Sequence, residues 1–323
     1  MLKLSRRRRL GVALLPLVLA GGVVSACGSS NSSSSSGSSG SSGGVTIKSA
    51  TFPWTAAGLT NAILTTVATE HPELGVKGIT TTQLGPAPAW AGAQRGDVDL
   101  LSEIALPNQQ HFVDAAKTKI TVASQTYGDA QQGWFVPTQS TQPGQPLAGL
   151  TSVSQLNQFK TQLNGQLVDA DPTYVTTTQN KKRLQGYGID FQDVSSSESA
   201  QQAQLQRAVE RKEPILVYLY HPSWVFGAFQ LTQLTEPKPY TAGCLESSGK
   251  GDCAMPAYSA SVALSKDAQK KAPKFYAMLQ HFTLTIPDIE AMSAKVTQDK
   301  QPVDQVAQQY VDSHPDLVKQ WIG

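Results

Sequence analysis

From Val45 onward, short strand-like runs alternate with helical patterns, and this order limits the folds that the chain can adopt. The run 45–51 alternates as a strand does, and Leu59, Ile63 and Val67 then recur at helical spacing. Later segments repeat this succession of strand and helix. Alternation of this kind predicts an α/β fold, in which ligands bind beyond the carboxyl ends of the strands.

The expected elements fall into three groups along the chain. The first group has strands at 45–51, 76–82 and 97–101, with helices beginning near 56 and spanning 86–96. The second group has strands at 132–137, 166–170 and 214–220, with helices at 152–163, 175–187 and 195–211. The third group begins with a strand near 258 and ends with helices at 302–310 and 315–322.

The N-terminal segment predicts export. Lys3 and Arg6–Arg9 precede an apolar run at 10–24, which is the order of a secretory signal, and the run is too short and glycine-broken to indicate a membrane span. Small residues stand directly before Cys27, which resembles the bacterial lipobox. We therefore expect a signal peptide at 1–26 and a lipid anchor on Cys27. An ordinary cleaved signal with an incidental cysteine is the alternative.

Residues 28–44 contain only glycine and serine apart from Asn31, so we expect 27–44 to be the lipidated cysteine and a flexible tether. The whole chain has 26 basic and 24 acidic residues. Five of the basic residues precede Cys27, which leaves 21 against 24 after cleavage. The basic excess thus belongs to the signal, and we expect no nucleic-acid partner.

The two remaining cysteines, Cys244 and Cys253, flank a loop rich in glycine, serine and lysine. In an exported protein this arrangement predicts a disulfide bond. No histidine or second cysteine pair lies near enough to suggest zinc, and the five histidines are scattered along the chain without ligand spacing. We expect no metal, no cofactor and no catalytic residue.

An ordered set of short motifs spans nearly the whole mature chain. It runs from Phe52-Pro53-Trp54 through Arg95-Gly96-Asp97-Val98-Asp99, Gly133-Trp134-Phe135-Val136-Pro137, Asp171-Pro172, Ser195-Ser196-Ser197 and Glu213-Pro214-Ile215-Leu216-Val217 to Pro222-Ser223-Trp224 and Leu234-Thr235-Glu236-Pro237-Lys238. In this order the set resembles the glycine betaine/choline-binding proteins of ABC importers, the ProX/OpuAC-like family of quaternary ammonium substrate-binding lipoproteins.

The resemblance implies a two-lobed, periplasmic-binding-protein-like fold of type II, with a hinge and a ligand cleft between the lobes. We expect lobe 1 at 45–137 plus 237–323 and lobe 2 at 138–236, with hinge crossings near 134–137 and 237–240. It also implies a monomer that closes over an osmoprotectant and delivers it to an ABC permease at the outer face of the bacterial cytoplasmic membrane.

A quaternary ammonium has no N–H group to donate, so recognition must come from aromatic faces, each contributing about 0.5–2 kcal/mol. Four aromatic residues follow expected strand ends: Trp54, Tyr174, Tyr220 and Trp224. In the family, an aromatic before the Pro-x-Trp segment typically lines the cage, and Tyr220 holds that position. Trp224 faces a helix start rich in phenylalanine, which favours an ordinary packed ring.

Two further residues are candidates for ligand contact, and two positions depart from the family pattern. Asp171 would add a carboxylate beside Tyr174. His221 lies just before Pro222, where relatives often carry a histidine after the proline, and it is a candidate replacement. Family members often have tryptophan at Ala105 or near Leu284, so the identity of the ligand stays open.

Three functions remain as alternatives. A binding lipoprotein for glycine betaine, choline or a related quaternary ammonium is favoured, with a different small solute as a variant of it. A surface interaction module of the same fold, without transport, is second. An exported enzyme is the least favoured, because from Val45 onward neither His-Glu-x-x-His nor Gly-x-Ser-x-Gly occurs.

Overall fold

The structure is a computed structural model that describes residues 44–323. The predicted signal peptide, Cys27 and all of the tether before Gly44 lie outside the described residues. Within 44–323, no helix combines the length and the apolar character needed to span a bilayer.

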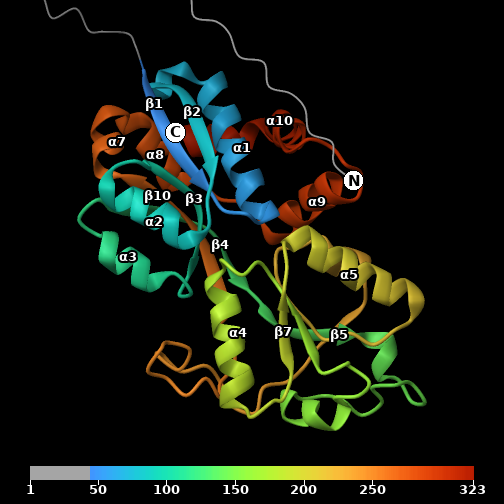
Figure 1. Cartoon of the computed structure of the whole chain (residues 1–323). Coiled ribbons are helices and arrows are strands. Elements are labelled where there is room, and N and C mark those ends of the chain that lie inside the picture. Colours follow the sequence, from blue (N-terminus) through green and yellow to red (C-terminus); the bar gives the residue numbers. More distant parts are fainter. Residues whose placement is uncertain (1–43) are drawn as a thin grey trace, which may run out of the picture. The chain divides into compact units, whose positions relative to one another are not determined.

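Two five-stranded sheets form the framework (Figure 1). The first has the order β2-β1-β3-β10-β4 and the second has the order β7-β6-β8-β5-β9. The bounds in the first sheet are β1 Val45–Thr51, β2 Val76–Gln83, β3 Leu100–Leu106, β4 Ile120–Ala130 and β10 Tyr258–Ser265. In the second they are β5 Gln132–Pro137, β6 Gln166–Asp169, β7 Gln192–Ser195, β8 Val217–Tyr220 and β9 Leu231–Gln233.

Each sheet with its helices makes one lobe, and we call these the first and the second lobe. The first lobe carries α1 Thr55–Glu70, α2 Pro86–Arg95, α3 Gln110–Ala116, α7 Lys266–Lys271, α8 Pro273–His281, α9 Ile286–Thr297, α10 Val303–Ser313 and α11 Pro315–Ile322. The second lobe carries α4 Val175–Gly186, α5 Glu198–Arg211 and α6 Val225–Ala228. The expected two-lobed α/β fold is confirmed.

Each lobe has parallel strand pairs that lead to the site. β1 pairs in parallel with β2 and β3, and β6 pairs in parallel with β7 and β8. The chain leaves β1 through Pro53 and Trp54 and enters α1, whose Leu59, Ile63 and Val67 are fully buried. The carboxyl ends of these strands therefore carry the segments from which the site is built.

The first crossing between the lobes lies before β5 rather than after it. All of β5 is in the second sheet, where it pairs with β8 and β9, whereas β4 ends at Ala130 in the first sheet. The crossing is therefore at Gln131, and the boundary expected at 137 moves by six residues. β4 and β5 follow each other almost without interruption, and the nearest glycines, Gly128 and Gly133, lie inside the two strands and not between them.

The second crossing lies later than Pro237. After β9 the chain stays on the second lobe, where Lys182 donates to the carbonyl of Ser247 (2.8 Å) and Arg183 donates to the carbonyl of Cys253 (3.2 Å). It returns to the first sheet only with β10. The return segment is therefore 254–257, and the expected crossing at 237–240 belongs to the second lobe.

Three local expectations also change. A strand, β4, and a short helix, α3, occupy a region for which no element was expected. The helix expected at 152–163 is a 3₁₀ helix over Val153–Phe159, although Ser152 does cap it as expected. The helix expected from Ser195 starts at Glu198, because 192–195 pairs with β6 as β7.

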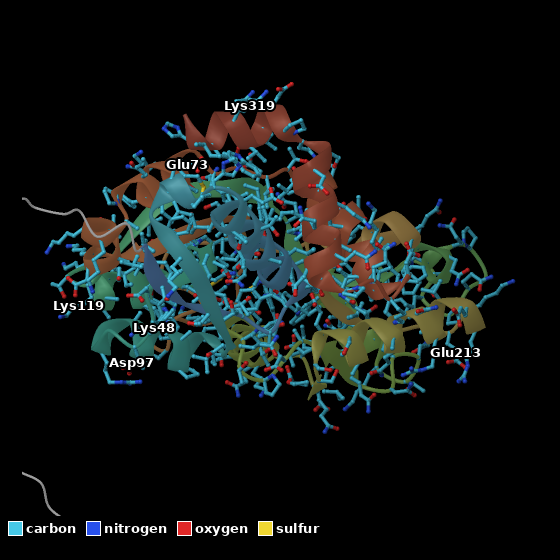
Figure 2. All side chains as sticks on the ribbon, turned by 90° about the horizontal axis from the view of Figure 1, so that it is seen from above. Lys48, Glu73, Asp97, Lys119, Glu213 and Lys319 are labelled. Atoms are coloured by element: carbon cyan, nitrogen blue, oxygen red, sulfur yellow. A yellow bond between two sulfur atoms is a disulfide. The ribbon has the colours of Figure 1, made fainter. Side chains whose placement is uncertain are left out.

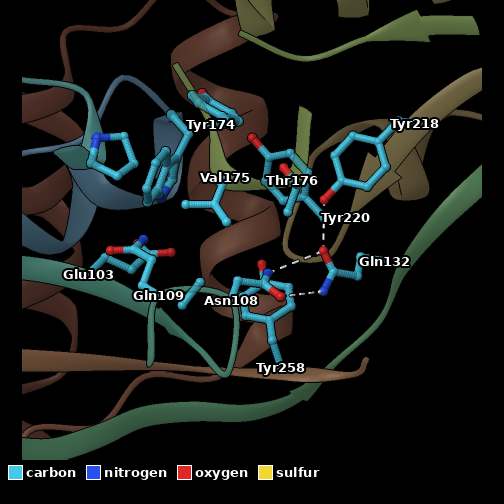
Figure 3. A pocket seen from close by; sticks show the side chains of 13 residues that line it. Glu103, Asn108, Gln109, Gln132, Tyr174, Val175, Thr176, Tyr218, Tyr220 and Tyr258 are labelled. Atoms are coloured by element: carbon cyan, nitrogen blue, oxygen red, sulfur yellow. Dashed lines mark hydrogen bonds between the residues drawn. The ribbon is translucent and has the colours of Figure 1, made fainter. Parts of the chain in front are cut away.

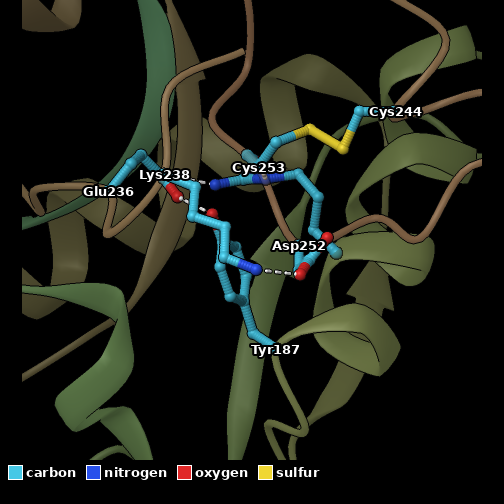
Figure 4. The surroundings of a disulfide bond; sticks show 7 residues. Tyr187, Glu236, Lys238, Cys244, Asp252 and Cys253 are labelled. Atoms are coloured by element: carbon cyan, nitrogen blue, oxygen red, sulfur yellow. Dashed lines mark hydrogen bonds and ion pairs between the residues drawn. A yellow bond between two sulfur atoms is a disulfide. The ribbon is translucent and has the colours of Figure 1, made fainter. Parts of the chain in front are cut away.

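A disulfide joins Cys244 to Cys253, as expected (Figure 4). Next to it, Lys238 forms an ion pair with Asp252. Gly251 within this loop has φ of +77°, and a Cβ there would approach the carbonyl oxygen of Lys182 to 2.5 Å. The loop is thus fitted closely against α4.

A buried arginine organises the centre of the second lobe. The guanidinium of Arg183 is fully buried, lies 4.1 Å from the centre of the Trp134 ring, and forms an ion pair with Glu236. Asn180 accepts a further bond from it (3.1 Å) and also accepts from the Trp134 indole (2.8 Å). The labelled lysines Lys48, Lys119 and Lys319, by contrast, lie on the outside (Figure 2).

The substitution Arg183→Met is expected to lower the free energy of unfolding by about 3–5 kcal/mol, because it leaves Glu236 as an uncompensated, nearly buried charge. Denaturant unfolding measures this. Arg95→Met is the matched control: its pair with Asp97 is about two-thirds exposed on both sides, so a loss below about 1 kcal/mol is expected. Equal losses in the two variants would contradict the central role of Arg183.

Candidate ligand-binding site

A cavity opens where the strand ends of the two lobes meet (Figure 3). Both lobes supply its walls. The lining residues from the first lobe are Trp54, Pro86, Glu103, Ala105, Asn108, Gln109 and Tyr258, and those from the second are Gln132, Tyr174, Val175, Thr176, Tyr218 and Tyr220. The predicted cleft between lobes is therefore present as a cavity rich in aromatic rings.

Each aromatic side chain reaches the cavity from a strand or from its carboxyl end. Trp54 follows β1, Tyr174 follows β6, Tyr218 and Tyr220 are on β8, and Tyr258 begins β10. Trp54 and Tyr174 meet edge to face, with ring centroids 5.0 Å apart. This contact joins the first lobe to the second at the cavity wall.

The hydroxyls of the four cavity tyrosines are all tied to protein acceptors. Tyr174 donates to the carbonyl of Pro53 (2.9 Å), Tyr220 to Glu198 (2.7 Å) and Tyr218 to Gln132 (2.7 Å). Tyr258 donates to the carbonyl of His221. The rings are thereby fixed in place, and their faces, not their hydroxyl protons, are what the cavity offers.

Glu103 places a carboxyl group in this aromatic wall. It lies on β3 and is 2% exposed, and its Oε1 accepts from Tyr127 at 2.5 Å. Burial raises the pKa of Glu103 to about 7, and the hydrogen bond from Tyr127 opposes this effect without cancelling it. The charge of the cavity therefore changes near neutral pH.

Glu198 links the lobes directly. It stands at the first turn of α5 in the second lobe, and its Oε2 accepts from the backbone N–H (2.8 Å) and the hydroxyl (2.6 Å) of Thr55 at the start of α1. Its Oε1 accepts from Tyr220. One carboxyl group, close to two helix N-termini, thus connects a cavity ring to the opposite lobe.

A larger hollow of about 510 Å³ adjoins the cavity. The two share Pro86, Asn108, Tyr174 and Val175. Its outer wall includes residues of the disulfide-closed loop, such as Leu245, Glu246 and Ser247. The hollow shares a wall with the cavity, and the disulfide-closed loop forms one side of it.

Three of the six residues expected to bind ligand line the cavity: Trp54, Tyr174 and Tyr220. They come together because each follows a strand whose carboxyl end points to the space between the sheets. Ala105, expected to replace a tryptophan, also lies in the wall, whereas Leu284 is not part of it.

The other three expected residues are not among those that line the cavity. Asp171 accepts from Thr173 (2.8 Å to its N–H) in the turn before α4. His221 follows Tyr220 and so points to the other side of the strand, where it contacts Glu290 (2.7 Å). Trp224 is packed in the core of the second lobe and donates to Gln202 (2.6 Å). Their positions do not support ligand contact.

Glu103, Tyr218 and Tyr258 also line the cavity and were not predicted from the sequence. Tyr218 was detectable, since it lies two residues before Tyr220 and so shares its face of the strand. Glu103 is the acidic residue within the otherwise uncharged strand Leu100–Leu106, which is itself a signal of a special role. Tyr258 comes from a strand far along the chain, and only the sheet order brings it to the site.

The raised pKa of Glu103 gives a pH dependence of stability. The folded state retains a proton that the unfolded chain loses above its ordinary value of 4.5, so this group lowers stability as pH rises from about 4.5 to about 7. Across that pH range, the free energy of unfolding of the wild type is expected to fall by up to about 3 kcal/mol relative to that of the Glu103→Gln variant. Denaturant unfolding of both proteins at several pH values measures the difference, and parallel curves would contradict it.

The bridge made by Glu198 has a separate test. Glu198→Gln removes a charged acceptor shared by Thr55 and Tyr220, so a loss of about 1–3 kcal/mol in the free energy of unfolding is expected. Glu213→Gln, an exposed change near the end of α5, is expected to stay within about 0.5 kcal/mol of the wild type. A Glu198 variant as stable as this control would show that the bridge contributes nothing.

Comparison with known proteins agrees with this geometry. Among curated proteins, a glycine betaine/carnitine transport binding protein from Listeria monocytogenes serotype 1/2a is 26% identical over 157 residues. That match covers 48% of this chain and 47% of the relative, so the chain spans about half the length of the curated relative that it matches.

Solved structures show the same fold. A lactococcal OpuAC in a closed conformation with glycine betaine has a TM-score of 0.72 at 21% identity, covering 86% of this chain and all of the other. An ABC-transporter choline-binding protein in complex with choline has a TM-score of 0.71 at 16% identity, with coverage of 85% and 91%. A family profile described as the substrate-binding domain of an ABC-type glycine betaine transport system matches residues 45–313. The chain belongs to this family of substrate-binding domains of ABC-type glycine betaine transport systems.

Proposed function

We propose that this protein captures a quaternary ammonium compound outside the cytoplasm and presents it to an ABC permease. The observation that carries the proposal is the aromatic wall built from both lobes. Trp54 and Tyr258 come from the first lobe, and Tyr174, Tyr218 and Tyr220 come from the second. Rings around a small cavity suit a cation that has no N–H group to donate.

The relatives support the choice of ligand class. The curated relative is named for glycine betaine and carnitine, and the two solved neighbours were determined with glycine betaine and with choline. These compounds share a trimethylammonium group. In this proposal that group occupies the aromatic cavity and the remainder of the ligand extends toward Asn108, Gln109 and Thr176.

Capture would proceed by closure of the two lobes. Residues from both lobes meet around the cavity, and Glu198 holds Thr55 of the opposite lobe. A ligand between them would favour the closed form through the contacts that it adds to both walls. Rotation would be absorbed at Gln131 and 254–257, where the chain passes between the sheets.

The N-terminal segment supplies the rest of the proposal. A signal at 1–26, a lipid on Cys27 and a tether to residue 44 would hold the monomeric domain near the permease at the outer face of the cytoplasmic membrane. Neither a catalytic role nor a nucleic-acid partner belongs to this function. The family is one of transport proteins, which agrees with a binding role.

Isothermal titration with tetramethylammonium, choline, glycine betaine, carnitine and proline betaine tests the proposal. Micromolar binding of at least one is expected, since several rings each contribute about 0.5–2 kcal/mol. Tyr220→Leu is expected to weaken that binding about tenfold, whereas Tyr220→Phe keeps the ring and most of the affinity. Phe229→Leu, a half-buried ring of the second lobe outside the cavity, is the control. Absence of binding by all five compounds would refute the proposed function.

A further inference from the structure

The cavity has an acidic wall and no basic one. Of its thirteen lining residues, Glu103 is the one with a carboxyl group, and within 44–323 no lysine, arginine or histidine lines it. A second carboxyl group, that of Glu198, lies just behind Tyr220. The local charge therefore attracts cations and repels anions.

Hydrogen-bond donors for an anion are also scarce in the cavity. The hydroxyl protons of Tyr174, Tyr218, Tyr220 and Tyr258 are given to protein acceptors. The amide of Gln132 donates to Pro256 at 2.7 Å. The amide of Asn108 makes a long contact of 3.4 Å with Gln132, and the Trp54 side chain is a hydrogen-bond partner of Glu103. The other side-chain donors in the lining are the amide of Gln109 and the hydroxyl of Thr176. The carboxylate of a bound ligand would therefore find only uncharged hydrogen-bond donors in this cavity.

Glu103 itself retains capacity to accept. Its Oε1 receives the short bond from Tyr127, and Oε2 has a long contact of 3.4 Å with the hydroxyl of Thr60, while the Trp54 side chain also lies within donating reach of the carboxyl group. A ligand hydroxyl can donate to that oxygen, as a charge-assisted bond. A ligand carboxylate at the same place would face a like charge instead.

We propose that the cavity selects trimethylammonium compounds with a net positive charge and a hydroxyl donor, of the choline type, over zwitterions such as glycine betaine, and that Glu103 determines this choice. The proposal rests on the proposed function and narrows it. The two compounds are nearly the same size and differ at the group opposite the ammonium, so shape alone does not separate them.

The proposed role of Glu103 also predicts that protons are released when a cationic ligand binds. The groups around Glu103 are Trp54 after β1, Tyr127 on β4, Tyr258 on β10, Thr60 on α1 and, from the second lobe, Glu198 on α5. Within that set, as the structure describes it, no positive charge offsets the carboxylate. A bound cation would supply it, lower the pKa of Glu103 from about 7, and so displace a proton near neutral pH.

The test is a calorimetric comparison of choline, glycine betaine and tetramethylammonium on the intact protein at pH 8. Choline is expected to bind about tenfold or more tightly than glycine betaine. In the Glu103→Gln variant, the affinity for choline is expected to fall about tenfold. The affinities for choline and glycine betaine should then be nearly equal. Glu290→Gln removes one negative charge that pairs with His221 outside the cavity, and it should keep the wild-type ratio.

A second measurement counts protons. Choline titrated at pH 6.5 in two buffers of different ionisation enthalpy is expected to release protons from the wild type but not from Glu103→Gln. Glycine betaine binding as tightly as choline, or an affinity ratio unchanged by Glu103→Gln, would overturn this inference while leaving the proposed function intact. Failure of all three compounds to bind would refute the proposed function and this inference with it.

Discussion

The cavity depends on the hydrogen bonds that hold its tyrosine hydroxyls away from the space that the rings enclose. A tyrosine side chain has an apolar ring face and a hydroxyl group that donates a hydrogen bond. In this cavity each tyrosine hydroxyl donates to an acceptor of the protein. Tyr174 is tied to the backbone of the opposite lobe through Pro53, and Tyr220 is tied through Glu198 to Thr55. The same bonds therefore fix the rings and connect the lobes.

Support for this arrangement comes from the core of the second lobe. Arg183 stacks on Trp134, pairs with Glu236 and holds the carbonyl of Cys253. It thereby joins α4, β5 and the disulfide-closed loop in one buried set of contacts. Since Tyr174 stands immediately before α4, the position of this helix also sets one wall of the cavity.

Local patterns in the sequence were sufficient for most of the framework. Strands such as Val45–Thr51 and the helix that follows Trp54 have clear periodicity, and three ring positions follow from strand ends. The lobe boundary at Gln131 was not predicted, because β4 and β5 follow each other almost without interruption and the strand partners that separate them are distant in sequence. Tyr258 required the sheet order, since β3 and β10 are neighbours in space and distant in sequence. Glu103 stands out locally as the acidic residue of β3, but only the sheet order places it beside Tyr258. His221 was misplaced because one residue along a strand reverses the face to which a side chain points.

The two passages between the lobes run next to each other. The side chain of Gln132, one residue after the first passage, donates to the carbonyl of Pro256 in the second, and the N–H of His221 donates to the carbonyl of Gln131. Two adjacent peptide connections resist twisting and sideways sliding far more than they resist folding about their common line. Small dihedral changes at the two crossings rotate one lobe relative to the other. Atoms far from the line through the crossings move further than atoms close to it. In the proposed opening of the lobes, the bonds of Glu198 to Thr55 are among those that would have to break, so this carboxyl group would act as a latch on the closed form.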